Sequence, residues 1–106
     1  MTQIGNFTKI SDGSYVGEIV TLWVQAKNVR IEALDSGQIE NGFTHRVTVG
    51  RAEIGVARSN LSDSGQDCLA LTLDDPSFEA PIFAILIDNP DGATAKLIWT
   101  RSLRHD

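Results

Sequence analysis

The stretch LDDPSFEAPIFAIL, residues 73–86, decides how the chain folds, because it places two acids and a proline between two apolar runs. Proline cannot donate to a sheet ladder, so Asp-Asp-Pro-Ser is suited to leave one strand before the next begins. Asp74 and Asp75 are then solvated turn residues whose side chains cap local backbone N–H groups. A metal or acid–base pair needs further groups such as Glu79 or His45, and none stands at a helpful spacing. The strand-corner interpretation is therefore favoured.

On both sides of this stretch, apolar residues alternate with other residues at a period of two, as in strands that bury one face. Clusters of Gly, Asn, Asp and Ser separate these segments and are typical of hairpin turns. Two further segments, residues 19–24 and 82–87, are apolar on both faces and are predicted to be central strands or strands covered on their outer side. The alternating segments are residues 29–33, 43–49, 68–73 and 95–100.

No window of the sequence holds a convincing helical stripe bounded by caps. Short strands with turns every 8–12 residues are typical of a small barrel or a sandwich. The sequence therefore predicts one all-β domain over residues 1–101, an antiparallel β-barrel or sandwich of about seven strands with little or no helix. Residues 102–106 are predicted to be a frayed tail.

Length, composition and charge bound the class of protein. The 106 residues suit a single domain, and 42% hydrophobic with 22% charged residues is ordinary for a globular chain. The net charge of −5 repels nucleic acid and anionic membranes at long range. The sequence has no apolar run long enough for a membrane helix, no recognisable signal peptide and one cysteine. These features predict a cytoplasmic protein that does not bind membranes.

Few residue types that carry chemistry stand in a useful pattern. His45 lies on the apolar register of its strand, which predicts a satisfied core histidine, and the second histidine, His105, is in the tail. Cys68 is predicted to pack as a small apolar residue. Trp23 and Trp99 are predicted to be core residues, with a stacking platform for a ligand as the alternative. The sequence therefore predicts no enzyme, no metal site and no cofactor.

Several segments in order resemble the family catalogued as domain of unknown function 736, short and mostly alphaproteobacterial proteins often encoded near plasmid-transfer genes. The family has no established activity, so the resemblance implies kinship and no reaction. The segments that carry it are IGNFTK at residues 4–9, Tyr15-Val16-Gly17, AEIG at 52–55, LDDPSFEAPIFA at 73–84 and LIWTR at 97–101.

One hairpin departs from the family's pattern. After AEIG, the family usually continues through a tryptophan, several lysines and a tyrosine, which are residue types that a single-strand-binding barrel uses for stacking and phosphate contacts. Here Arg58 stands at the tryptophan position, Cys68 at the tyrosine position, and most of the lysines are replaced by neutral or acidic residues. The change weakens the expectation of a nucleic-acid role for this hairpin, although exposed hairpins also vary freely in composition.

Two classes of function remain open. The first is a non-catalytic interaction module that binds a protein partner or self-associates through a sheet edge or an exposed face. The alternative is a single-stranded nucleic-acid-binding β-barrel associated with mobile elements. The acidic charge and the altered hairpin favour the first, and the gene neighbourhoods of the family favour the second. The candidate binding residues are Arg46, Arg51, Arg58, Trp23 and Trp99.

Overall fold

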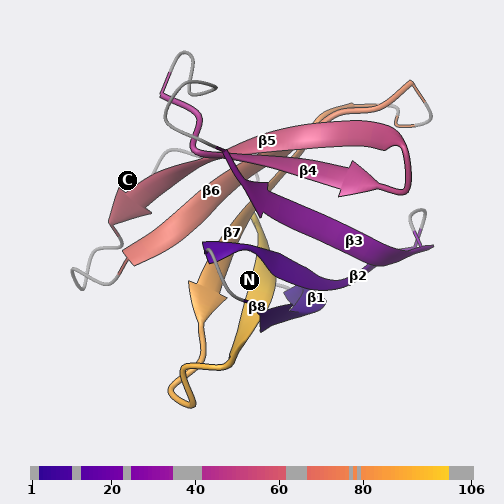
Figure 1. Cartoon of the computed structure of the whole chain (residues 1–106). Helices are drawn as coiled ribbons and strands as arrows, with labels where there is room; N and C mark the ends of the chain where they lie inside the picture. Colours follow the sequence, from indigo (N-terminus) through magenta and orange to yellow (C-terminus); the bar gives the residue numbers. More distant parts are fainter. Residues whose placement is uncertain are drawn as a thin grey trace.

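In the described part of the chain, eight strands follow one another, and each pairs antiparallel with the next (Figure 1). The computed structural model describes residues 3–10, 13–22, 25–34, 42–61, 67–76, 78 and 80–100. The strands are β1 (Gln3–Lys9), β2 (Tyr15–Val20), β3 (Gln25–Ala33), β4 (His45–Val49), β5 (Ala52–Leu61), β6 (Asp67–Leu73), β7 (Ile82–Asp88) and β8 (Thr94–Thr100). The predicted all-β fold is confirmed, with eight strands where about seven were expected.

The sheet closes into a barrel because β8 pairs antiparallel with β1. Closure gives every strand a neighbour on both sides, which removes the free edge that open sheets expose. The barrel alternative is therefore confirmed over the sandwich. No whole strand is left with a free edge, although residues 25–28 of β3 have no β4 residue opposite them. Association through a sheet edge or an exposed face stays a prediction.

The barrel interior is filled by the apolar side chains that the period-two pattern places on one face. Facing residues on neighbouring strands share a side of the sheet, so Ile31 lies opposite Val47 and Leu71 opposite Ala84. The largest fully buried side chains are Phe7, Ile19, Ile31, Leu71, Leu73, Leu86, Leu97, Val29 and Val47.

The two segments predicted to be apolar on both faces differ in outcome. Residues 82–87 form β7 as expected, and the outward-facing Ile85 is only 5% exposed between Ala70 and Ile98 on the flanking strands. The expectation for residues 19–24 is wrong at residues 21 and 22, because β2 ends at Val20, and residues 23 and 24 lie outside the described part of the chain. Val20 is 48% and Leu22 84% exposed, since the chain turns there instead of continuing through the sheet.

Two glycines make room for the ring of Phe7 inside the barrel. A methyl group on Gly5 would lie 3.2 Å from Cε1 of that ring, and one on Gly17 would lie 2.8 Å from Cδ2. The ring is 2% exposed and lies against the strand that carries Gly17. Glycine in a strand interior often marks such a close approach, and both glycines fall in segments that carry the family resemblance.

The connections gather at two ends of the barrel, which differ in character. The LDDP end, named for residues 73–76, carries the β2–β3, β4–β5 and β6–β7 connections. There Asp74 N–H donates to Ile54 O at 2.7 Å and Phe78 N–H to Asp75 O at 2.8 Å. Phe78 and Trp99 pack, partly buried, against the core. The predicted position of residues 74 and 75 at a strand corner is confirmed, because they connect β6 to β7. The capping role expected of their side chains stays a prediction.

Candidate binding site at the mouth of the barrel

The opposite end, here called the mouth, carries the β1–β2, β3–β4, β5–β6 and β7–β8 connections and contains a cavity of about 310 Å³. Residues at the ends of strands line this cavity, most of them with inward-facing side chains, and Cys68 lines it from the outer register of β6. Its floor is formed by Leu69 and Leu86, which are 8% and 2% exposed. The remaining lining residues are Lys9, Tyr15, Ser59, Cys68 and Asp88.

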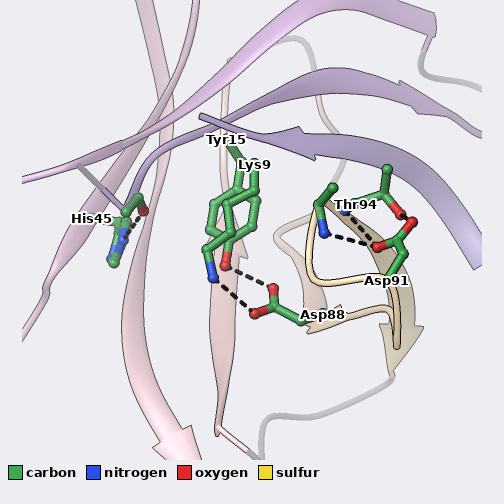
Figure 2. A network of polar contacts seen from close by, with 8 residues as sticks. Lys9, Tyr15, His45, Asp88, Asp91 and Thr94 are labelled. Carbon is green, nitrogen blue, oxygen red and sulfur yellow. Dashed lines mark hydrogen bonds and ion pairs between the residues drawn. The ribbon is translucent and has the colours of Figure 1, made fainter. Parts of the chain in front are cut away.

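Three of these residues form a polar network across β1, β2 and β7 (Figure 2). Tyr15 Oη donates to Asp88 Oδ1 at 2.8 Å, and Lys9 Nζ donates to Asp88 Oδ2 at 3.1 Å. Lys9 and Tyr15 face each other in the β1–β2 register, and the ammonium lies 6.0 Å from the centre of the tyrosine ring. The Asp88 carboxylate therefore binds two side chains, and Tyr15 and Lys9 lie 73 and 79 positions before it in the sequence.

The electrostatics of the network keep Tyr15 as a donor. Burial raises the pKa of the Tyr15 phenol, and the hydrogen bond and charge of Asp88 raise this pKa further. The phenol is therefore protonated at physiological pH. The side chains of Lys9 and Asp88 are 39% and 35% exposed, so their ion pair is partly screened by water and contributes little to stability. It does make the local charge close to zero.

His45 is held beside the mouth by two neighbours. Its ring Nε2 lies 3.0 Å from Gly13 O, and Nδ1 lies 2.8 Å from Thr44 Oγ1. Because a carbonyl only accepts, Nε2 carries the proton, and the neutral ring then accepts from the threonine hydroxyl at Nδ1. The residue is 9% exposed, and this burial lowers the pKa of His45, although the Gly13 bond opposes the shift. The predicted core histidine is confirmed.

We expect the stability of the protein to fall as pH is lowered through the range in which unfolded histidine titrates. The pKa of His45 is below 6.5 in the folded state, so the unfolded chain binds more protons between the two values and unfolding becomes easier as pH falls. Urea unfolding from about pH 7.5 to about pH 5.5 measures this loss. The free energy of unfolding of His45→Gln should depend less on pH in this range than that of the wild type. The dependence that remains would come from carboxylates. An identical pH profile in the variant would contradict the assignment.

The β7–β8 turn next to Asp88 is built by another carboxylate. Asp91 Oδ1 accepts from the backbone N–H groups of Ala93 and Thr94, both at 2.9 Å, and Oδ2 accepts from Thr94 Oγ1 at 2.8 Å (Figure 2). These bonds lower the pKa of the Asp91 carboxyl. Gly92 adopts a φ of 72°, which the tight turn requires. The turn therefore holds the end of β7 in place beside the cavity.

Two of the three arginines predicted as candidate binding residues share the outer face of the β4–β5 pair, and the third lies apart from them. Arg46 lies on the outer face of β4 and forms an ion pair with Glu32 at 3.2 Å. Arg58 lies on the outer face of β5, with its guanidinium 4.8 Å from the ring centre of Phe43. Arg51 is exposed in the β4–β5 turn at the LDDP end.

The tryptophans and the altered hairpin complete the predicted set. Trp99 is half-buried on β8, opposite Ala84, and packs against the core. Trp23 lies outside the described residues. The hairpin of residues 58–68 is formed by β5 and β6, and its connecting residues 62–66 also lie outside the described part. Cys68 is 7% exposed and lines the mouth cavity, in keeping with the predicted packing role.

Sequence reasoning missed the residues that make up the mouth network. Lys9 and Tyr15 flank a predicted turn, and Asp88 directly precedes the turn sequence Asn-Pro-Asp-Gly. The sequence signal for such a site is a charged or phenolic residue at the end of a strand, on the register that faces the interior. This signal does not show that the ends of three strands meet at one place.

Two further observations bear on the type of site. Among the described residues, no three His, Cys, Asp or Glu side chains are close enough to share a metal ion. No described segment forms a helix with the length and apolar character needed to cross a membrane.

The fold and the site define a class of protein: a closed, eight-stranded antiparallel barrel with a polar cavity at one end. The family model described as protein of unknown function (DUF736) matches residues 3–102. The chain therefore belongs to this family, and the resemblance drawn from its sequence segments is confirmed. No match was found among curated proteins or among solved structures.

Proposed function

We propose that this protein is a non-catalytic interaction module that binds a protein partner through the end of its β2–β3 hairpin. The observation that carries the proposal is the exposure of two large apolar side chains there, Val20 at 48% and Leu22 at 84%. The other large apolar side chain in the described residues with comparable exposure is Ile10, at 41%, beyond the end of β1 at the mouth. Exposed apolar side chains that adjoin one another are typical of interaction sites.

The hairpin end also extends past its neighbour in the barrel. The last described rung between β2 and β3 pairs Val20 with Gln25, whereas the last rung between β3 and β4 pairs Val29 with Val49. Residues 25–28 of β3 therefore have no β4 residue opposite them in the register. An incoming protein can approach the exposed apolar side chains from this side without displacing a strand.

The energetics favour a partner with an apolar pocket. Full burial of a leucine side chain contributes about 1.5–3 kcal/mol relative to its exposure to water. Leu22 is mostly exposed in the isolated barrel and has nearly all of that free energy still to gain. A few exposed apolar anchors at a hairpin end match the way in which a few central side chains dominate protein interfaces.

The arrangement of the polar groups supports a non-catalytic role. At the mouth, Lys9, Tyr15 and Asp88 are bound to one another, and the imidazole of His45 is buried with both nitrogens engaged by Gly13 and Thr44. A general base needs to reach a substrate proton directly or through one water. These groups instead form hydrogen bonds with one another, with the Thr44 hydroxyl and with the Gly13 carbonyl.

The test is binding of an affinity-purified partner to variants of the full chain. Leu22→Ser should weaken the interaction with that partner at least about tenfold, equivalent to about 1.4 kcal/mol, as measured by isothermal titration calorimetry. Ile10→Ser, the same kind of change on an exposed side chain at the other end, should leave the affinity unchanged. Equal melting temperatures of the variants would show that folding is not the cause.

Three outcomes would overturn the proposal. Equal losses in Leu22→Ser and Ile10→Ser would mean that the hairpin end is not the docking site. A wild-type dimer in size-exclusion chromatography with light scattering, converted to a monomer by Leu22→Ser, would make a second copy of the chain the occupant. Loss of the partner after nuclease treatment would transfer support to nucleic-acid binding.

One observation favours the nucleic-acid alternative. Arg46 and Arg58 share the outer face of the β4–β5 pair, and Arg58 covers the ring of Phe43. A cation beside an aromatic ring is a combination used to bind single strands. Its support is weaker, because Glu32 neutralises Arg46 and the whole chain carries a charge of −5. Micromolar binding of a labelled single-stranded oligonucleotide, lost in Arg58→Ala, would favour this function.

A further inference from the structure

The mouth cavity holds an ion pair above an apolar floor, at the end of the barrel opposite the proposed docking site. The ammonium of Lys9 and the carboxylate of Asp88 are 3.1 Å apart, and both side chains are accessible to solvent. Leu69 and Leu86 lie beneath them. The cavity thus combines a positive group, a negative group and a small apolar surface within one enclosure.

The ion pair disfavours ligands that carry a single charge. A carboxylate that approaches Lys9 is repelled by Asp88, and an ammonium that approaches Asp88 is repelled by Lys9, since the two groups are in contact. Each attraction is thereby largely cancelled. A ligand that carries both charges can set its carboxylate against the lysine and its ammonium against the aspartate. Both attractions are then retained, and the pair is extended into an alternating arrangement of four charges.

The remaining lining groups define the size and shape of the ligand. Tyr15 donates to Asp88 and holds this carboxylate in one orientation, and Ser59 adds a hydroxyl that can donate or accept. The volume of about 310 Å³ is at the lower end of the roughly 300–1,000 Å³ typical of ligand pockets. The leucine floor suits a short apolar side chain.

We propose that the mouth cavity binds a small zwitterion with an apolar side chain, of which a free apolar α-amino acid is the simplest example. Its carboxylate contacts Lys9, its ammonium contacts Asp88, and its side chain packs on Leu69 and Leu86. The site is separate from the hairpin end that carries the proposed function, so either can fail without the other.

The test uses three probes that share one side chain and differ in charge. L-leucine carries both charges, N-acetyl-L-leucine only the negative one and L-leucinamide only the positive one. Calorimetric titration with up to about 10 mM of each probe covers ligands bound by about 4 kcal/mol, for which Kd is about 1 mM. Leucine should bind, and each of the other two should bind at least about tenfold more weakly, because each meets one uncompensated like charge.

Matched lysine variants separate the site from general charge effects. Lys9→Met removes the ammonium and keeps most of the stem, and it should abolish the preference for leucine over leucinamide. Lys96→Met makes the same change on β8, opposite Asn6 and Ile87 and away from the cavity lining, and should retain the preference.

Any of three results would overturn the proposal: no binding of leucine by the wild type, equal binding of a singly charged probe, or a preference for leucine over leucinamide that a folded Lys9→Met variant retains. The comparison of probes uses the unaltered protein, so it remains decisive even if Lys9→Met fails to fold.

Discussion

Replacing Gly17 with alanine is expected to lower the free energy of unfolding by about 3 kcal/mol or more, which is a large part of the roughly 5–15 kcal/mol typical of a domain. A methyl group there would lie 2.7 Å from Phe7 Cα and 2.8 Å from Phe7 Cδ2, and it would also overlap Asn6 O. Two of these three atoms belong to the backbone of β1, so relief requires the strands to move apart. Urea unfolding followed by tryptophan fluorescence measures the loss.

The control for this prediction is a glycine at a turn. Gly92→Ala places a methyl group where nothing lies within 4 Å, but at a φ of 72°. Its expected effect is about 1–2 kcal/mol and comes from backbone strain alone. If Gly17→Ala were no more destabilising than Gly92→Ala, close packing of β1 against β2 would not be the reason for the glycine.

Replacing Phe7 with alanine is expected to lower the free energy of unfolding by about 3–5 kcal/mol. The ring is 2% exposed and lies between Gly5 and Gly17, neither of which has a side chain that can fill the space left behind. The loss therefore combines the transfer of the ring to water with a cavity that the rigid strands cannot close. The same unfolding experiment applies.

Ile10→Ala is the matched control, three residues further along the chain. Its side chain is 41% exposed, so the change should lower stability by about 1 kcal/mol or less. A loss for Phe7→Ala as small as that for Ile10→Ala would mean that the barrel refills the space. The double variant Phe7→Ala with Gly17→Ala should lose less free energy of unfolding than the two single variants together. The added methyl group would occupy part of the space that the missing ring leaves.

Much of the fold was predictable, because a strand with one buried face shows an alternation of apolar and other residues in its local sequence. Val29 and Ile31, like Leu69 and Leu71, alternate with residues on the outer face, and each pair is buried as expected. The corner at residues 74–76 was equally visible, since proline excludes a continued ladder. Closure was not predictable, because it depends on the pairing of β1 with β8 at opposite ends of the chain.

The hairpin end shows why hydrophobic pattern alone misleads. Residues 19–24 are apolar on both faces, which also describes β7, yet Leu22 is exposed whereas Ile85 is buried. Ile85 has apolar neighbours on both flanking strands, Ala70 and Ile98, whereas the β2–β3 hairpin extends past the last rung with β4. Burial of the outer face depends on these neighbours, and the local sequence does not specify them.

The sequence by itself determined the all-β class, the alternating strands with their inward register, the turns between them and the family. Each follows from short-range physics, the alternation of side chains along a strand and the conformational limits of glycine and proline, or from short contiguous motifs. Only the tertiary structure decided the closed barrel, the exposed Leu22 and the meeting of Lys9, Tyr15 and Asp88 at the mouth. These depend on contacts between residues as far apart in the sequence as Gln3 and Ile98, which exist only once the barrel closes.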